Sequence, residues 1–193
     1  EITRTNEDSL GPGNDAVILN TGTIDAGGAN GATKNDGIDF QDYGGIVLNN
    51  GTLPGARHAI TSGENVTVIN GAAGTILGRD GSGVGSDGDG TVFNYGTITG
   101  AYDGSGTGDG DGVDIDGYAT ITNFGTIEGT GAGGNGSDGL PNGSEGVSIG
   151  GGEILNAANA IISGANNGIL VDDSSQGNAP YATTIVNAGT IQG

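Results

Sequence analysis

The chain has 193 residues, 45 of them glycine, and its 23 acidic and 4 basic side chains give a formal net charge of −19. It has no cysteine, which excludes disulfides, thiolate metal sites and cysteine nucleophiles. So acidic a surface repels phosphate, and no apolar run reaches the ~18 residues of a membrane span, so we expect neither a nucleic-acid partner nor membrane insertion of this segment.

A short unit, Asn-x-Gly-Thr-Ile-x-Gly, recurs in seven full or looser copies along the chain. The copies begin at Asn20, Asn49, Asn70, Asn94, Asn123, Asn156 and Asn187, and those at Asn70 and Asn156 carry a two-residue insertion. The aliphatic position of the unit is occupied by Ile24, Leu53, Ile76, Ile98, Ile127, Ile162 and Ile191. Successive aliphatic positions are 22 to 35 residues apart, which indicates a fixed frame with loops of different length inserted into it.

Two further patterns keep their place relative to each asparagine. A β-branched aliphatic residue, of a kind that suits a pleated and half-buried surface, stands two positions earlier, at Ile18, Val47, Val68, Val92, Ile121, Ile154 and Ile185. Upstream of it, an acid or amide followed by glycine and alternating aliphatics predicts a second strand, at 36–40, 111–115, 145–149 and 167–171. The 22-residue step has only Gly83-Val84-Gly85 in this place, so the frame is weakest there.

These patterns predict an all-β fold, a right-handed parallel β-helix of about seven coils of 22–35 residues with three short strands per coil. We expect residues 1–193 to form a single β-helix segment, part of a longer rod, with inward side chains stacked in columns. The asparagine column is predicted to form a hydrogen-bonded ladder at a sharp corner, where asparagine tolerates the left-handed conformation. The alternative is that asparagine is only a common turn former.

The repeated Asn-x-Gly-Thr-Ile-x-Gly units, with Asp-Gly-Val-x-Ile between copies, resemble the β-helical passenger regions of bacterial autotransporter adhesins and related secreted surface proteins. The resemblance extends from Asn14 to Gly193. It implies export across two membranes and display at the cell surface. It leaves the activity open, because such passengers include adhesins, enzymes and simple stalks.

Three loops combine aspartate with glycine, near 80–90, 103–112 and 130–144. Carboxylate oxygens on a backbone free to curl are typical of calcium loops, and Gly133–Leu140 matches one nonapeptide calcium pattern. The candidate calcium ligands are Asp87, Asp89, Asp103, Asp109, Asp111, Asp114, Asp116 and Asp138, with the 103–116 loop first. Alternatively, these residues only fill exposed and soluble loops.

No catalytic motif stands out. The single histidine, His58, follows Arg57 in a predicted loop without an evident partner, and 23 acids bring pairs of carboxylates together by chance. We therefore expect no enzyme and no required cofactor. A carbohydrate-processing or carbohydrate-binding β-helix is the alternative; an enzyme should gather Arg57, His58 and carboxylates of neighbouring coils in one groove.

Two outward features bear on partners. A threonine column, Thr23, Thr52, Thr75, Thr97, Thr126 and Thr190, should face solvent as an ordinary strand surface. The residue just before each asparagine is mostly apolar, in the stripe Leu19, Leu48, Ile69, Phe93, Leu155 and Val186. Strict alternation would expose this stripe, but we favour its burial by a turn of the chain, since large apolar residues are costly in water. If it is exposed, lateral bundling of rods becomes the leading hypothesis.

The sequence thus predicts a structural or adhesive extracellular rod, displayed on a bacterial surface or assembled into a fibre. Its expected partners are neighbouring copies or further coils of the same protein, together with host or surface glycans. A second alternative is a disordered acidic segment that responds to calcium.

Overall fold

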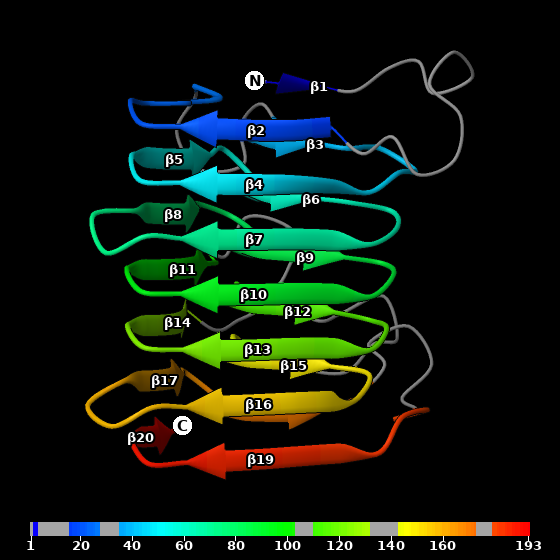
Figure 1. Cartoon of the computed structure of the whole chain (residues 1–193), viewed down its shortest axis with the longest axis vertical. Helices are drawn as coiled ribbons and strands as arrows, with labels where there is room; N and C mark the ends of the chain where they lie inside the picture. Colours follow the sequence, from blue (N-terminus) through cyan, green and yellow to red (C-terminus); the bar gives the residue numbers. More distant parts are fainter. Residues whose placement is uncertain (1, 4–15, 28–34, 103–109, 132–142, 173–178) are drawn as a thin grey trace.

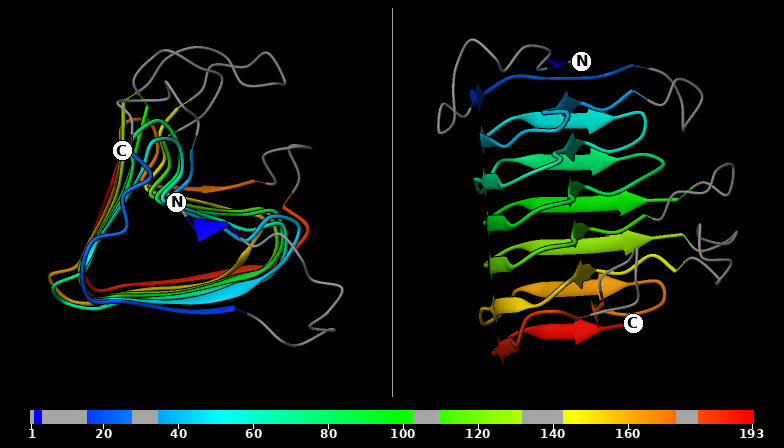
Figure 2. Two further views of the ribbon diagram at one scale, coloured as in Figure 1. Left: turned by 90° about the horizontal axis from the view of Figure 1, so that it is seen from above. Right: turned by 90° about the vertical axis from the view of Figure 1, so that its right-hand side faces the viewer.

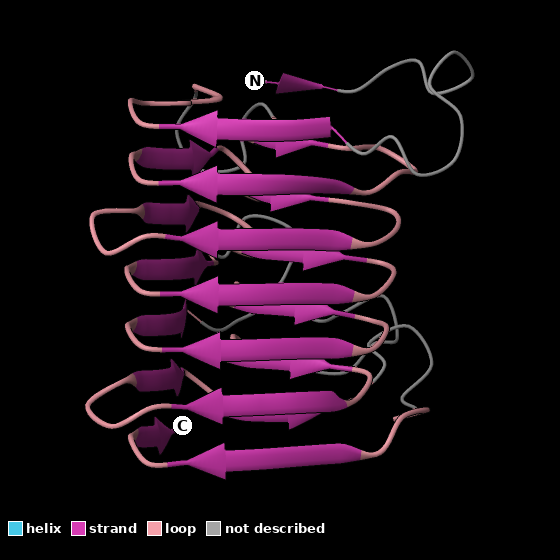
Figure 3. Cartoon of the chain, viewed as in Figure 1, coloured by secondary structure: helices cyan, strands magenta, loops and turns pink. Residues whose placement is uncertain are grey.

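The computed structural model describes residues 2–3, 16–27, 35–102, 110–131, 143–172 and 179–193. Within these ranges the chain consists of strands and loops, without helices (Figure 3). The described part accordingly holds no helix long and apolar enough to cross a membrane.

The strands form three parallel sheets, which we call A, B and C. Sheet A contains β1 (Ile2–Thr3), β3 (Ile38–Asp39), β6 (Ile60–Thr61), β9 (Val84–Ser86), β12 (Val113–Ile115), β15 (Val147–Ile149) and β18 (Ile169–Val171). Sheet B contains β2 (Ala16–Asn20), β4 (Gly45–Asn49), β7 (Val66–Asn70), β10 (Gly90–Asn94), β13 (Ala119–Asn123), β16 (Gly152–Asn156) and β19 (Thr183–Asn187). Sheet C contains β5 (Thr52–Gly55), β8 (Thr75–Gly78), β11 (Thr97–Ala101), β14 (Thr126–Thr130), β17 (Ile161–Gly164) and β20 (Thr190–Gln192).

Each coil contributes one strand to each sheet, in the order A, B, C, except that the first coil meets sheet C only through the isolated bridge between Thr23 and Thr52. The coils descend in sequence order from β2 to β19 and wind in the right-handed sense (Figure 1). Seen from above, successive coils superimpose and sheet B forms one long side (Figure 2). The predicted parallel β-helix of about seven coils with three strands each is confirmed.

The inward residues stack as the frame predicts. Leu53, Ile76, Ile98, Ile127, Ile162 and Ile191 are in register across sheet C. Ile18 and its six counterparts are likewise in register across sheet B. Residues of the inner coils, such as Ile98 and Val92, are completely buried. Burying one such side chain contributes about 1.5–3 kcal/mol, so the columns are the main source of stability for this glycine-rich chain.

The asparagine ladder is confirmed over its full length. The Nδ2 atom of each asparagine donates to the Oδ1 atom of the next coil's asparagine, over 2.8–2.9 Å, from Asn20 to Asn187. Each ladder asparagine ends a strand of sheet B, and the only described non-glycine residues with positive φ are Gln41 and Asn159. The expected left-handed conformation is therefore wrong. Asparagine is used here because its amide both donates and accepts along the column.

The coil at the 22-residue step, where the sequence pattern is weakest, has all three strands, β9, β10 and β11. β9 pairs in parallel with β12 in the next coil and with β6 in the previous one, and Val84 is fully buried. The strand β6 was not predicted from the upstream pattern, because its coil has His58-Ala59 where the others have an acid, amide or serine followed by glycine.

Candidate functional site

The structure gives Arg57 and His58 a common partner in the preceding coil. The Arg57 guanidinium binds the Asp36 carboxylate through two hydrogen bonds, with Nη2 2.6 Å from Oδ2 and Nε 2.9 Å from Oδ1. The His58 backbone N–H donates to the same Oδ1 over 3.1 Å. Asp36 is buried, whereas the Arg57 side chain is 41% exposed. The expectation that Arg57 and His58 lack a partner is wrong.

His58 belongs to a second polar column, at the corner between sheets C and A. This corner column consists of the residues two positions before the sheet A strands β3 to β18, namely Asp36, His58, Ser82, Asp111, Glu145 and Asn167. The Ser82 N–H donates to His58 Nδ1 over 2.8 Å, the Glu145 N–H to Asp111 Oδ1 over 2.7 Å, and Asn167 Nδ2 to Glu145 Oε1 over 3.0 Å. The side-chain acceptors of Asp36, His58, Asp111 and Glu145 thus bind donors of the next coil, which is a structural role. The buried Ser82 Oγ has no hydrogen-bond partner among the described residues, so the column is interrupted there.

The environment of His58 favours the neutral imidazole. Burial first, and the positive charge of Arg57 second, lower the pKa of His58 from 6.5 to about 4, against the weaker opposing effect of Asp36. Because Nδ1 accepts the Ser82 N–H, the single ring proton belongs on Nε2. A histidine held neutral in this way fixes two coils together.

We expect His58 to make the fold sensitive to acid. Its pKa is lower in the folded than in the unfolded chain, so the unfolded chain takes up the proton first as the pH falls. The contribution of neutral His58 to the free energy of unfolding should be fully present above pH ~6.5. The free energy of unfolding should then fall by as much as about 3 kcal/mol towards pH ~4. Urea unfolding followed by circular dichroism across this range measures the loss.

The control for this measurement is His58→Asn. Asparagine offers an acceptor in the place of Nδ1, does not titrate, and already stands at the equivalent position of the corner column, at Asn167. As the pH falls from 6.5 to 4, the wild type should lose stability relative to the variant. Parallel curves over this interval would contradict the assignment.

The candidate calcium ligands divide into separate groups. Asp103, Asp109 and Asp138, together with Gly133–Leu140, lie outside the described residues. Asp111 is buried in the corner column, whereas Asp114 is half-buried between the inward residues Val113 and Ile115 of β12. The alternation of the strand therefore separates these two carboxylates.

The remaining three candidates lie at the corner between sheets A and B. Asp116 is one coil beyond Asp87, because Ile115 is in register with Ser86. Asp89 Oδ1 accepts the backbone N–H of Tyr118 over 2.7 Å. Across the ranges that the structure describes, no three acidic or histidine side chains are grouped so as to hold a metal ion. Calcium binding stays a prediction.

Four of the six residues of the apolar stripe before the asparagines are exposed and Leu48 and Phe93 are half-buried, so the expected burial is wrong. Leu19, Ile69, Leu155 and Val186 are 69%, 37%, 39% and 54% exposed. The strands of sheet B continue through the asparagine, so the alternation turns the asparagine inward and the residue before it outward. The predicted threonine column of sheet C also faces outward: Thr23, Thr52 and Thr75 are exposed, and Thr97 is half-buried.

The outer face of sheet B consists of two outward residues from each of seven strands, fourteen in all. One column is Leu19, Leu48, Ile69, Phe93, Thr122, Leu155 and Val186. The other is Val17, Ile46, Thr67, Thr91, Thr120, Glu153 and Thr184. Only Glu153 is charged, in a chain with a net charge of −19. Acids are instead found elsewhere, for example at Asp39 and Asp114 in sheet A.

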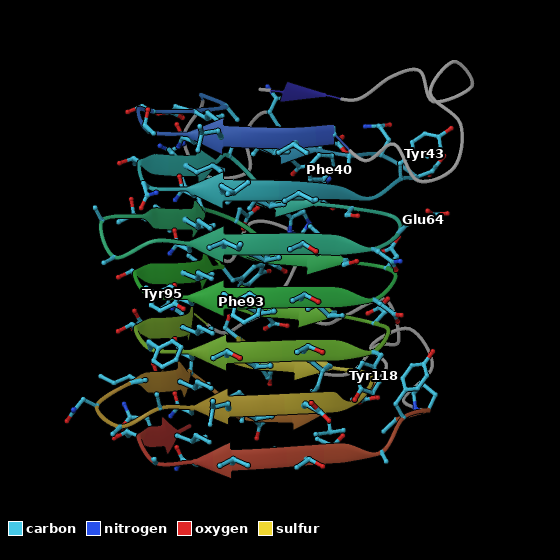
Figure 4. All side chains as sticks on the ribbon, in the orientation of Figure 1. Phe40, Tyr43, Glu64, Phe93, Tyr95 and Tyr118 are labelled. Atoms are coloured by element: carbon cyan, nitrogen blue, oxygen red, sulfur yellow. The ribbon has the colours of Figure 1, made fainter. Side chains whose placement is uncertain are left out.

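An aromatic pair borders this face. The Tyr95 and Phe124 rings stack with centroids 4.9 Å apart and planes 5° apart, and both side chains are nearly half exposed. Figure 4 shows Tyr95 where β10 turns towards β11, close to Phe93 on sheet B. The pair was missed from sequence, although both residues occupy the variable position of Asn-x-Gly in consecutive coils.

Taken together, the described residues define a parallel β-helix with two polar columns inside and an almost uncharged outer face on sheet B. No protein family model matches the chain, and neither a curated protein nor a solved structure is significantly similar to it.

Proposed function

We propose that the chain is a segment of a stiff extracellular rod, displayed on a bacterial surface or assembled into a fibre, with a structural and adhesive role. The observation that supports this most is the unbroken register of the stacked columns, from Asn20 to Asn187 through six ladder hydrogen bonds. Because every coil packs in the same way on the next, the architecture extends by adding coils and remains stiff.

The acidic surface and the inserted loops fit this role. A net charge of −19 keeps a rod soluble and makes neighbouring rods repel one another. The almost uncharged outer face of sheet B is the exception. The proposed partners are neighbouring copies or further coils of the same protein, and host or surface glycans at the loops.

The alternatives receive less support. An enzyme built on Arg57 and His58 would need a free carboxylate and a basic imidazole, whereas Asp36 is bound by Arg57 and the pKa of His58 is lowered to about 4. A disordered segment is at odds with the ordered sheets of the described residues.

Surface display is testable on cells of the organism that makes the protein. Antibodies raised against the purified chain should label intact cells, and external protease should remove the label while a cytosolic marker survives. Labelling that requires lysis of the cells would overturn the proposal.

A further inference from the structure

We propose that the outer face of sheet B is a self-association surface, on which a second copy of the chain packs its own sheet B face to face. The inference rests on the proposed rod function and specifies one of its partners.

The exposed apolar area of this face is the first argument. Val17 and Leu19 are 65% and 69% exposed, and at the other end of the sheet Val186 is 54% exposed. Between them, Ile69 and Leu155 are exposed and Phe93 is half-buried, while β13 presents only threonines, and all seven strands are in register. Exposed apolar side chains gathered on one face of a soluble protein mark a contact surface, and β-branched side chains, threonine included, pack well between two sheets.

Charge selects a second copy as the occupant. Two copies of a chain with a net charge of −19 repel one another wherever their acids face each other. The outer face of sheet B carries a single charged side chain, Glu153, so two copies can approach there with little repulsion. A partner of opposite charge would instead be attracted to the acidic loops.

The size of the face fits a weak and extensible contact. With seven strands ~4.8 Å apart and five residues per strand that rise ~3.3 Å each, the face measures roughly 30 Å along the rod by 17 Å along the strands. This is about 500 Å² of flat surface per copy. The total of about 1,000 Å² is the lower bound for a specific interface. Association of this segment should therefore be weak and concentration-dependent. The contact area, and with it the free energy of association, should increase in proportion to the number of coils.

Glu153 sets the relative direction of the two rods. In a parallel pair, β16 faces β16, and the two Glu153 positions lie only about two residues, ~7 Å, apart along the strand direction. In an antiparallel pair centred on β10, β16 faces β4, and the two carboxylates lie about four strand spacings apart, ~19 Å, beyond the ~8–10 Å Debye length. The antiparallel pair is the arrangement that we propose.

Sedimentation velocity on the purified chain, up to about 1 mM, tests the association. Wild type should form dimers as its concentration rises, and Phe93→Glu, at the centre of the face, should weaken the association at least about tenfold. The control Thr75→Glu adds the same charge to an exposed position on sheet C and should leave the association unchanged. Circular dichroism verifies that both variants fold.

Three results would overturn the proposal: a wild type that remains a single chain at all concentrations, equal effects of the two variants, or dissociation by a chelator, which would indicate cation bridges between acids. None of these results affects the labelling of intact cells, so the rod function would be judged separately.

Crosslinking tests the antiparallel arrangement, since the chain has no cysteine of its own. Leu19→Cys and Val186→Cys lie at opposite ends of one column. With a short bis-maleimide, a mixture of the two variants should crosslink, whereas Leu19→Cys alone should not. Adding Phe93→Glu to both variants should abolish the crosslink, which end-to-end stacking of β19 on β2 would retain. Crosslinked dimers of Leu19→Cys alone would establish the parallel pair instead.

Discussion

Ile98→Asp is expected to unfold the chain or reduce its stability by more than about 5 kcal/mol. Ile98 is completely buried in β11, in register with Ile76 in the preceding coil and Ile127 in the next. Loss of the aliphatic side chain alone costs about 2–5 kcal/mol, and an unpaired carboxylate in the column adds its desolvation. Domains are stable by only about 5–15 kcal/mol, so urea unfolding should show a loss of most or all of the transition.

The matched control is Thr97→Asp, the neighbouring residue on the same strand. Thr97 faces outward between Thr75 and Thr126, so the new carboxylate reaches water and meets no other acid in register. Its effect should be within about 1 kcal/mol. Equal losses for the two variants would mean that the inward column is not the core of the fold.

The fold was predictable because the chain repeats its own frame. A single coil has strands of two to five residues, too short to be assigned with certainty. Seven copies fix which positions face inward, and the register observed for Ile98 and Val92 follows directly from aligning the copies. The repeated copies thus supply the inward and outward assignment that one strand of two to five residues is too short to give.

The burial of the apolar stripe was wrongly predicted because the cost of exposing large apolar side chains to water was given more weight than the alternation of side chains along a strand. Leu19 and Ile69 are costly in water, but the asparagine that follows each of them is buried, and there its amide takes part in the ladder. Since adjacent residues of a strand cannot both face inward, the hydrogen-bonded ladder decides the orientation. The stripe remains exposed, and this exposure is what the proposed self-association uses.

The corner column shows where chain patterns alone were insufficient. Asp36 and His58 are 22 residues apart, and only the registration of β3 on β6 places them in adjacent coils. Reading the position two residues before each sheet A strand as a column would have found the pair. The upstream pattern of an acid or amide followed by glycine does not include His58-Ala59, so this coil did not match it.

The asparagine ladder gives the second large prediction, for Asn94→Asp. The Nδ2 atom of Asn94 donates to Asn123 Oδ1, to the Thr126 carbonyl and to the Gly96 carbonyl, over 2.8, 2.9 and 3.2 Å. Aspartate has the same shape but places an oxygen against these three acceptors and buries a charge. We expect a loss of about 3–5 kcal/mol in the free energy of unfolding, measured in urea at neutral pH.

Asn50→Asp is the control, because it makes the same chemical change at an exposed residue next to the ladder asparagine Asn49. Its effect should stay within about 0.5 kcal/mol. Acidification should recover part of the loss in Asn94→Asp, because a protonated carboxyl again offers one donor to the column. If the two variants were equally stable at neutral pH, the ladder would contribute no net stability, and the choice of asparagine in all seven coils would need another physical cause.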